Sequence, residues 1–155
     1  MSDRDLYQLA ARVGQALRAA GWRLASAESC TAGWIAKALT DVPGSSQWFE
    51  CGYVTYSNAA KQRDLGVSAR TLVEHGAVSE ATVKQMAAGA SRICGAEVAV
   101  AVSGIAGPEG GTRDRRTGPE GGILREVQQS FRRRCGKTSI NIRAPTRSVE
   151  TSRIF

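Results

Sequence analysis

The 155-residue chain contains one histidine, His75, and four cysteines scattered without a C-x-x-C pair. A serine or cysteine hydrolase with a histidine base therefore has one candidate. That candidate precedes Gly76 at the end of a predicted helix, where histidine usually interacts with the helix dipole. The cysteine spacing argues against a zinc site or a disulfide framework and favours a cytoplasmic location. No apolar run approaches the roughly 20 residues that cross a membrane, and the polar, acidic start does not resemble a secretory signal.

Acidic residues are few only in the last part of the chain. Residues 1–112 carry 10 Lys and Arg against 10 Asp and Glu, whereas residues 113–155 carry 11 against 4, which accounts for the net charge of +7. A basic tail is compatible with nucleic-acid binding. No interleaved aromatic residues or known reader motif accompany the Arg132-Arg-Arg134 cluster, so this reading is the weaker alternative.

Hydrophobic periodicity predicts an α/β domain with a largely parallel or mixed sheet in the neutral part of the chain. The apolar run 96–102 is typical of a strand that is buried on both faces. After residue 112 no apolar period is evident, apart from a weak helical pattern at 123–131. The expected helices are 3–20, 31–39, 58–65, 68–74 and 79–93, and the expected strands are 22–27, 48–56 and 96–102.

The stretch A-E-S-C-T-A-G-W at 27–34 joins a predicted strand to a predicted helix. Ser29 would lie at the carboxyl end of the strand, and the backbone amides of residues 30–33 would point at whatever it attacks. Such amides can stabilise an oxyanion. The alternative is that Ser29 or Thr31 caps the helix and that Cys30 fills space.

The segment Y-V-T-Y-S-N-A-A-K at 53–61 offers a base other than histidine. Tyr56 ends a predicted strand, and Lys61 follows on a short helix. A lysine that burial makes partly neutral can act as a general base, with a tyrosine hydroxyl to relay the proton. The alternative for Lys61 is an ordinary solvated lysine.

A glycine-rich stretch, V-S-G-I-A-G-P-E-G-G-T at 102–112, follows the buried strand. Its glycines would let the backbone approach an anion closely. It matches neither of the common nucleotide-binding patterns, so a plain turn is the alternative.

These motifs, together with V-P-G-S-S-x-W-F at 42–49 and G-A-V-S-E at 76–80, resemble the CinA C-terminal domain family over residues 5–112. The resemblance implies a three-layer α/β/α fold and hydrolysis of nicotinamide mononucleotide to nicotinate mononucleotide and ammonia. It implies no cofactor and no metal, and a homo-oligomer such as a dimer. It makes Ser29 the nucleophile, with Tyr56 and Lys61 as its partners. The substrate-binding residues that it implies are Cys30, Thr31, Gly33, Ser103, Gly104, Ile105, Ala106 and Gly107.

The chain departs from the family pattern in two places. Ala32 stands where the family usually has glycine. Residues 113–155 lack the family's final strands and helix. We therefore expect an incomplete amidase domain at 1–112, a disordered basic tail, and an open edge or an uncovered face on the strand 98–102. A frameshift would explain the tail, because codons for residues 131–137 can be chosen that read F-A-G-D-A-E one base out of frame, close to a family motif. Activity would then be impaired, and the second hypothesis is a noncatalytic chain whose tail binds nucleic acid.

Overall fold

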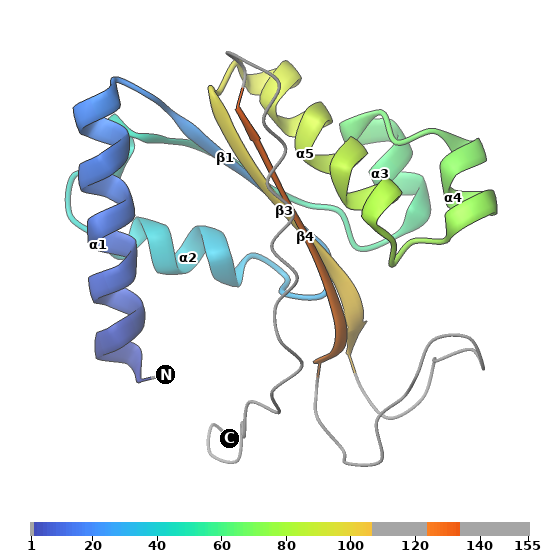
Figure 1. The fold of residues 1–155 in the computed structure, drawn as a ribbon, viewed down its shortest axis with the longest axis horizontal. Coiled ribbons are helices and arrows are strands. Elements are labelled where there is room, and N and C mark those ends of the chain that lie inside the picture. The colour runs from blue at the N-terminus through green and yellow to red at the C-terminus, as the bar shows by residue number, and fades with distance from the viewer. Residues whose placement is uncertain (1, 107–123, 134–155) are drawn as a thin grey trace.

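The computed structural model describes residues 2–106 and 124–133, which form one mixed sheet flanked by helices. The strand order is β2-β1-β3-β4 (Figure 1). Strand β1 (Leu24–Glu28) pairs in parallel with β2 (Phe49–Val54) and with β3 (Val98–Ala106). Strand β4 (Leu124–Arg133) is antiparallel to β3.

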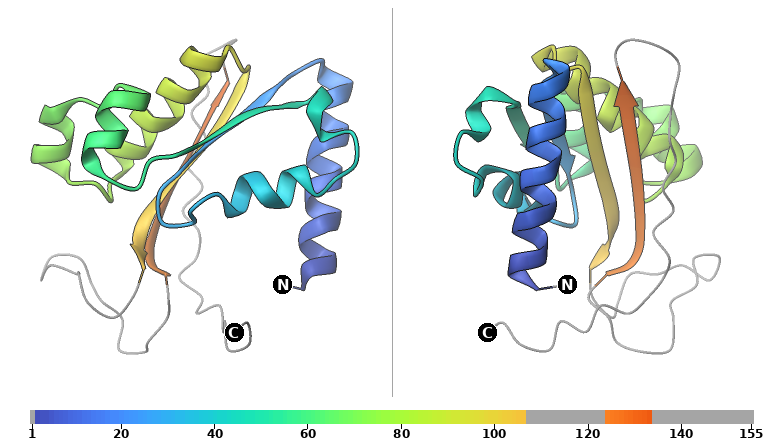
Figure 2. Two further views of the ribbon diagram at one scale, coloured as in Figure 1. Left: turned by 180° about the vertical axis from the view of Figure 1, so that it is seen from behind. Right: turned by 60° about the vertical axis from the view of Figure 1, so that its left-hand side comes forward.

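Helices cover both faces of the sheet, which gives the expected three-layer α/β/α arrangement (Figures 1 and 2). One face carries α1 (Asp3–Ala20) and α2 (Trp34–Thr40), and a short 3-10 helix, η1 (Ser45–Gln47), follows α2 along the chain. The other face carries α3 (Asn58–Leu65), α4 (Ala69–His75) and α5 (Glu80–Cys94). Six of the eight predicted elements in this part begin and end within about two residues of the prediction, whereas α2 begins three residues late and β3 ends four residues late.

Local signals in the sequence explain where the helices begin and end. Ser2 and Asp5 form a capping box at the start of α1, and Gly21 ends that helix in the left-handed conformation. Ser57, Ser68 and Ser79 each accept a hydrogen bond from a backbone amide of the first turn of α3, α4 and α5. The short helices therefore have their amino ends fixed in position.

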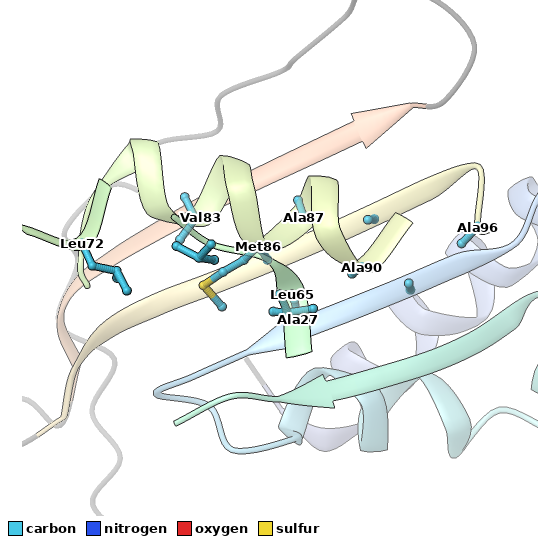
Figure 3. Packing of buried hydrophobic residues seen from close by; sticks show 12 residues of the cluster. Ala27, Leu65, Leu72, Val83, Met86, Ala87, Ala90 and Ala96 are labelled. Atoms are coloured by element: carbon cyan, nitrogen blue, oxygen red, sulfur yellow. The ribbon is translucent and has the colours of Figure 1, made fainter. Parts of the chain in front are cut away.

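Two hydrophobic cores lie on opposite faces of the sheet because side chains alternate along each strand. Ala25 and Ala27 of β1 face α5, where they join Val83, Met86 and Ala87 (Figure 3). Leu24 and Val98 face the other way and pack with a second set of buried residues from α1, α2 and the η1 region, namely Ala10, Leu17, Leu39 and Trp48.

The structure corrects two expectations about the sheet. The weak helical pattern at 123–131 is wrong, since these residues fall largely in β4, so disorder is also wrong for residues 124–133. In addition, β4 pairs along β3 from Val98 to Ala106, so the β3 edge that we expected to be open is covered. The apolar residues Leu124, Val127 and Phe131 recur at helical spacing, and pairing with β3 overrides this weak local pattern. The boundary at residue 112 and the rest of the tail lie outside the described residues.

None of the helices in the described part of the chain is long and apolar enough to cross a membrane.

Close packing of α5 on α3 depends on Gly89. A Cβ atom at this position would lie 1.9 Å from the carbonyl oxygen of Leu65. This oxygen belongs to the backbone and cannot rotate away as a side chain could. We expect Gly89→Ala to destabilise the fold by about 2 kcal/mol or more, as overpacking does, with a lower urea midpoint. The exposed residue Lys84 on the same helix supplies the control, since Lys84→Ala should change stability by no more than about 0.5 kcal/mol. Equal midpoints for the two variants would contradict this account of the packing.

Candidate active site

Ser29 follows directly on the last residue of β1, and the alternation of the strand decides where its side chain goes. Glu28 points towards α2, and Ser29 therefore points towards the layer that contains α3. The Ser29 amide donates to the Val102 carbonyl at 3.1 Å, which continues the β1–β3 pairing by one residue. Ser29 is buried, with a relative exposure of 7%.

Lys61 approaches Ser29 from the first turn of α3. Its Nζ lies 3.0 Å from Ser29 Oγ and also donates to the carbonyl oxygens of Thr55 at 2.8 Å and Tyr56 at 3.3 Å. Its side chain is buried, with a relative exposure of 1% for the residue. The alternative of a solvated surface lysine is therefore wrong.

Burial lowers the pKa of Lys61 from its ordinary value, because removal from water penalises the charged ammonium; the nearby Cys30 thiol has a smaller, opposite effect. A neutral amine has two N–H groups and one lone pair. The carbonyls of Thr55 and Tyr56 can take the two N–H groups, which directs the lone pair at Ser29 Oγ. The geometry suits proton removal from the serine hydroxyl.

Cys30 is next to Ser29 but is a poorer nucleophile. Burial raises the pKa of its thiol, and this outweighs the opposing effects of nearby amides and Lys61. The thiolate is the reactive form of cysteine, so a raised pKa reduces its reactivity.

Tyr56 contributes its backbone to the site. Its carbonyl accepts from Lys61, but its side chain is 69% exposed. Within the described residues its hydroxyl makes no hydrogen bond to Ser29 or Lys61. A proton relay through this hydroxyl stays a prediction. His75 ends α4, as predicted, and its side chain is exposed.

Glu28 is a residue of this site that the sequence analysis missed. It is fully buried, and its carboxylate accepts hydrogen bonds from five groups in the described part of the chain. Three of the donors are backbone amides at the start of α2, from Gly33, Ile35 and Ala36, at 2.9–3.1 Å. The other two are hydroxyls, those of Ser26 at 3.2 Å and Thr31 at 2.6 Å. The signal that could have identified Glu28 is its place as a lone acidic residue directly before the predicted nucleophile.

The helix-cap reading of Ser29 and Thr31 is wrong, because Glu28 caps α2 from the preceding strand. Gly33 occupies the N-cap position without a side-chain bond of its own. The expectation for the amides of residues 30–33 also needs correction. Gly33 N donates to Glu28 and Ala32 N to the Ser29 carbonyl. Among described groups, the amides of Cys30 and Thr31 donate to no backbone carbonyl in this turn, and both interact with the Cys30 sulfur.

Ala32 adopts φ 49°, the left-handed conformation that is rare for residues other than glycine. This explains in physical terms why glycine suits the position. The alanine side chain costs roughly 1 kcal/mol in this conformation. The hydrogen bonds around Glu28 hold the turn in spite of that cost.

The predicted binding residues Ser103, Gly104, Ile105 and Ala106 belong to β3 and not to a loop. The buried Ser103 hydroxyl donates to the Ala77 carbonyl at 2.8 Å, which joins β3 to the segment between α4 and α5. The Ser103 hydroxyl therefore takes part in a hydrogen bond that stabilises the fold. Gly107 lies outside the described residues.

Together the fold and the site define an α/β domain with a buried serine–lysine pair at the carboxyl end of its central parallel strands. Residues 6–123 match the CinA C-terminal domain, so the chain belongs to the CinA C-terminal domain family.

Two curated relatives show how far this similarity extends. The nicotinamide-nucleotide amidohydrolase PncC of Enterobacter agglomerans is 56% identical over 118 residues, which is 76% of this chain and 72% of that protein. A CinA-like protein of Shewanella denitrificans is 48% identical over 145 residues, 94% of this chain and 32% of that protein. Both the family match and the second alignment thus continue past residue 112.

The fold agrees with a solved structure of the family. The crystal structure of competence/damage inducible protein CihA from Agrobacterium tumefaciens superposes with a TM-score of 0.79 at 40% identity, covering 92% of this chain and 82% of that chain. This similarity supports the α/β architecture described above.

The Glu28 carboxylate can be tested by replacing one oxygen with an amide nitrogen. Each of its oxygens accepts from at least one backbone N–H, so Glu28→Gln must place an NH₂ group against a donor. We expect a loss of about 2–4 kcal/mol in the free energy of unfolding, since buried donors lose their acceptor, measured by urea denaturation. The exposed pair Arg70–Glu74 supplies the control, and Glu74→Gln should cost less than about 0.5 kcal/mol. A Glu28→Gln protein as stable as the parent would refute this role for Glu28.

Proposed function

We propose that the chain is a nicotinamide-nucleotide amidohydrolase, which converts nicotinamide mononucleotide to nicotinate mononucleotide and ammonia. The observation that carries the proposal is the 3.0 Å contact between Lys61 Nζ and Ser29 Oγ in a buried site. The named activity of the Enterobacter agglomerans relative, 56% identical, supplies the substrate class.

The first half of the reaction forms an acyl-enzyme. Lys61 Nζ takes the proton of Ser29 Oγ as this oxygen attacks the carboxamide carbon. The tetrahedral intermediate carries a negative oxygen, for which the amides of Cys30 and Thr31 are the available donors. Lys61 then passes its proton to the departing nitrogen, the C–N bond breaks, and ammonia leaves.

The second half hydrolyses the ester. Lys61, neutral again, takes a proton from water as the water oxygen attacks the ester carbon. Collapse of this second intermediate breaks the bond to Ser29 Oγ, which receives the proton back from Lys61. The products are the free serine and the nicotinate acid, which releases its proton to water to give the carboxylate, so no cofactor or metal is needed for the balance of atoms.

Several finer expectations remain part of this proposal. Cys30, Thr31, Gly33 and residues 103–107 would line the substrate site, and Tyr56 would assist proton transfer. The protein would act in the cytoplasm, and as a homo-oligomer such as a dimer. The buried Ser29–Lys61 pair supports an enzyme over a noncatalytic chain that binds nucleic acid through its tail.

The nucleophile can be identified from two neighbouring variants. Ser29→Ala should abolish ammonia release from nicotinamide mononucleotide, because no other hydroxyl contacts Lys61 Nζ within the described residues. Cys30→Ala should retain most of the activity, because burial raises the pKa of that thiol. The assay is ammonia release with purified, folded protein. Loss of activity in Cys30→Ala, with Ser29→Ala still active, would assign the chemistry to the cysteine.

The base can be identified in the same assay. Lys61→Ala should reduce kcat by a hundredfold or more, the usual scale for a general base, and Tyr56→Phe should do the same if its hydroxyl relays the proton. In the parent protein, kcat should rise with pH through the pKa of Lys61, which burial holds below its ordinary value. His75→Gln is the matched control and should stay active, because this histidine is exposed at the end of α4. An inactive but folded His75→Gln protein would instead indicate a serine–histidine mechanism.

A further inference from the structure

Thr55 carries a hydroxyl that has no partner. The residue is buried, with a relative exposure of 1%, and its Oγ1 makes no hydrogen bond in the described part of the chain. Buried hydroxyls are nearly always hydrogen-bonded, and an unpaired one costs about 1–3 kcal/mol. An isosteric valine would avoid this cost, so the presence of threonine needs an explanation.

The backbone places this hydroxyl beside the catalytic pair. Thr55 N donates to the Glu28 carbonyl at 2.8 Å, which continues the parallel pairing of β2 with β1 and sets Thr55 alongside Ser29. Cys51 and Tyr53 pack against the core on the α5 side of the sheet. By strand alternation the Thr55 side chain lies on that same side, which is also the side of Lys61.

Lys61 needs one more acceptor during the reaction than it has at rest. Its ammonium form has three N–H groups, and the carbonyls of Thr55 and Tyr56 accept two of them. In the resting site Ser29 Oγ is available for the third. During turnover the ammonium must hold its third proton after taking it from Ser29 and until it passes that proton to the departing nitrogen or back to Ser29 Oγ.

We infer that Thr55 is a positioning residue for Lys61: the Thr55 hydroxyl accepts an N–H of the ammonium while Lys61 holds the proton between taking it from Ser29 and passing it on. The inference rests on the proposed amidohydrolase mechanism. The hydroxyl belongs to the residue whose carbonyl oxygen already lies 2.8 Å from Lys61 Nζ, which places it next to the group that it would bind. The Thr55 hydroxyl then has no partner at rest because its partner, an N–H of the Lys61 ammonium, is present only during turnover.

The decisive comparison is Thr55→Val with Thr55→Ser, because valine keeps the shape and serine keeps the hydroxyl. Thr55→Val should lower kcat for ammonia release by about 10- to 100-fold, the scale of one hydrogen bond to a charged group. KM should change by less than about threefold, because the hydroxyl contacts the base and not the substrate. Thr55→Ser should retain kcat within about threefold of the parent. The unfolding temperatures of both variants should lie no more than a few degrees below that of the parent.

A purely structural threonine predicts a different result, namely an active and more stable Thr55→Val protein, and that result would overturn the inference. Equal losses of kcat in the valine and serine variants would overturn it as well. If Thr55→Val does not fold, Thr55→Ala and Thr55→Ser provide the same contrast of hydroxyl absent and present. The parent and Ser29→Ala proteins are assayed in parallel. An inactive parent would count against the proposed function, whereas an active parent with an equally active Thr55→Val would count only against the role of Thr55.

Discussion

The buried carboxylate of Glu28 is the contact on which the geometry of the site depends. Five donors from β1, the following turn and the start of α2 converge on it. A buried carboxylate is stable only when such donors replace its hydration. The turn between β1 and α2 must therefore wrap around this group, and Ala32 adopts a left-handed conformation as part of that path. The positions of Ser29 and of the amides of Cys30 and Thr31 follow from the same path of the turn.

Two buried polar groups, Glu28 and Lys61, lie on opposite sides of the sheet at the end of β1. Alternation sends the carboxylate to the α2 side and Ser29 to the α3 side, where Lys61 meets it. The carboxylate has five hydrogen-bond donors around it, whereas Lys61 has two backbone carbonyls and one hydroxyl. The better-satisfied group serves the structure, and the lysine that burial tends to neutralise is the one suited to carry a proton.

Much of the fold could be predicted from the sequence because its signals are local. Capping serines, terminal glycines and the period of α1 gave the helices, and the apolar run at 96–102 gave β3. Ser29 and Lys61 were predicted to be partners, and their contact is confirmed. The side of the sheet on which Glu28 is buried, the unpaired hydroxyl of Thr55 and the pairing of β4 with β3 all depend on contacts between distant segments. The place of Glu28 before a predicted nucleophile could have singled it out, but its burial could not be predicted, because the local sequence does not distinguish it from the exposed Glu74 of α4.

The distance between Lys61 and Ser29 is finally set by packing far from the chemistry. Lys61 reaches the site from α3, and the position of α3 depends on its contact with α5 at Leu65 and Gly89. Helix α5 in turn lies close to the sheet because β1 and β3 present Ala25, Ala27, Ala99 and Ala101 to it (Figure 3). A larger residue on this face would lift α5, and α3 with it, away from β1. Small side chains in the core thus allow a lysine from one layer to reach a serine in another, at the distance that proton transfer requires.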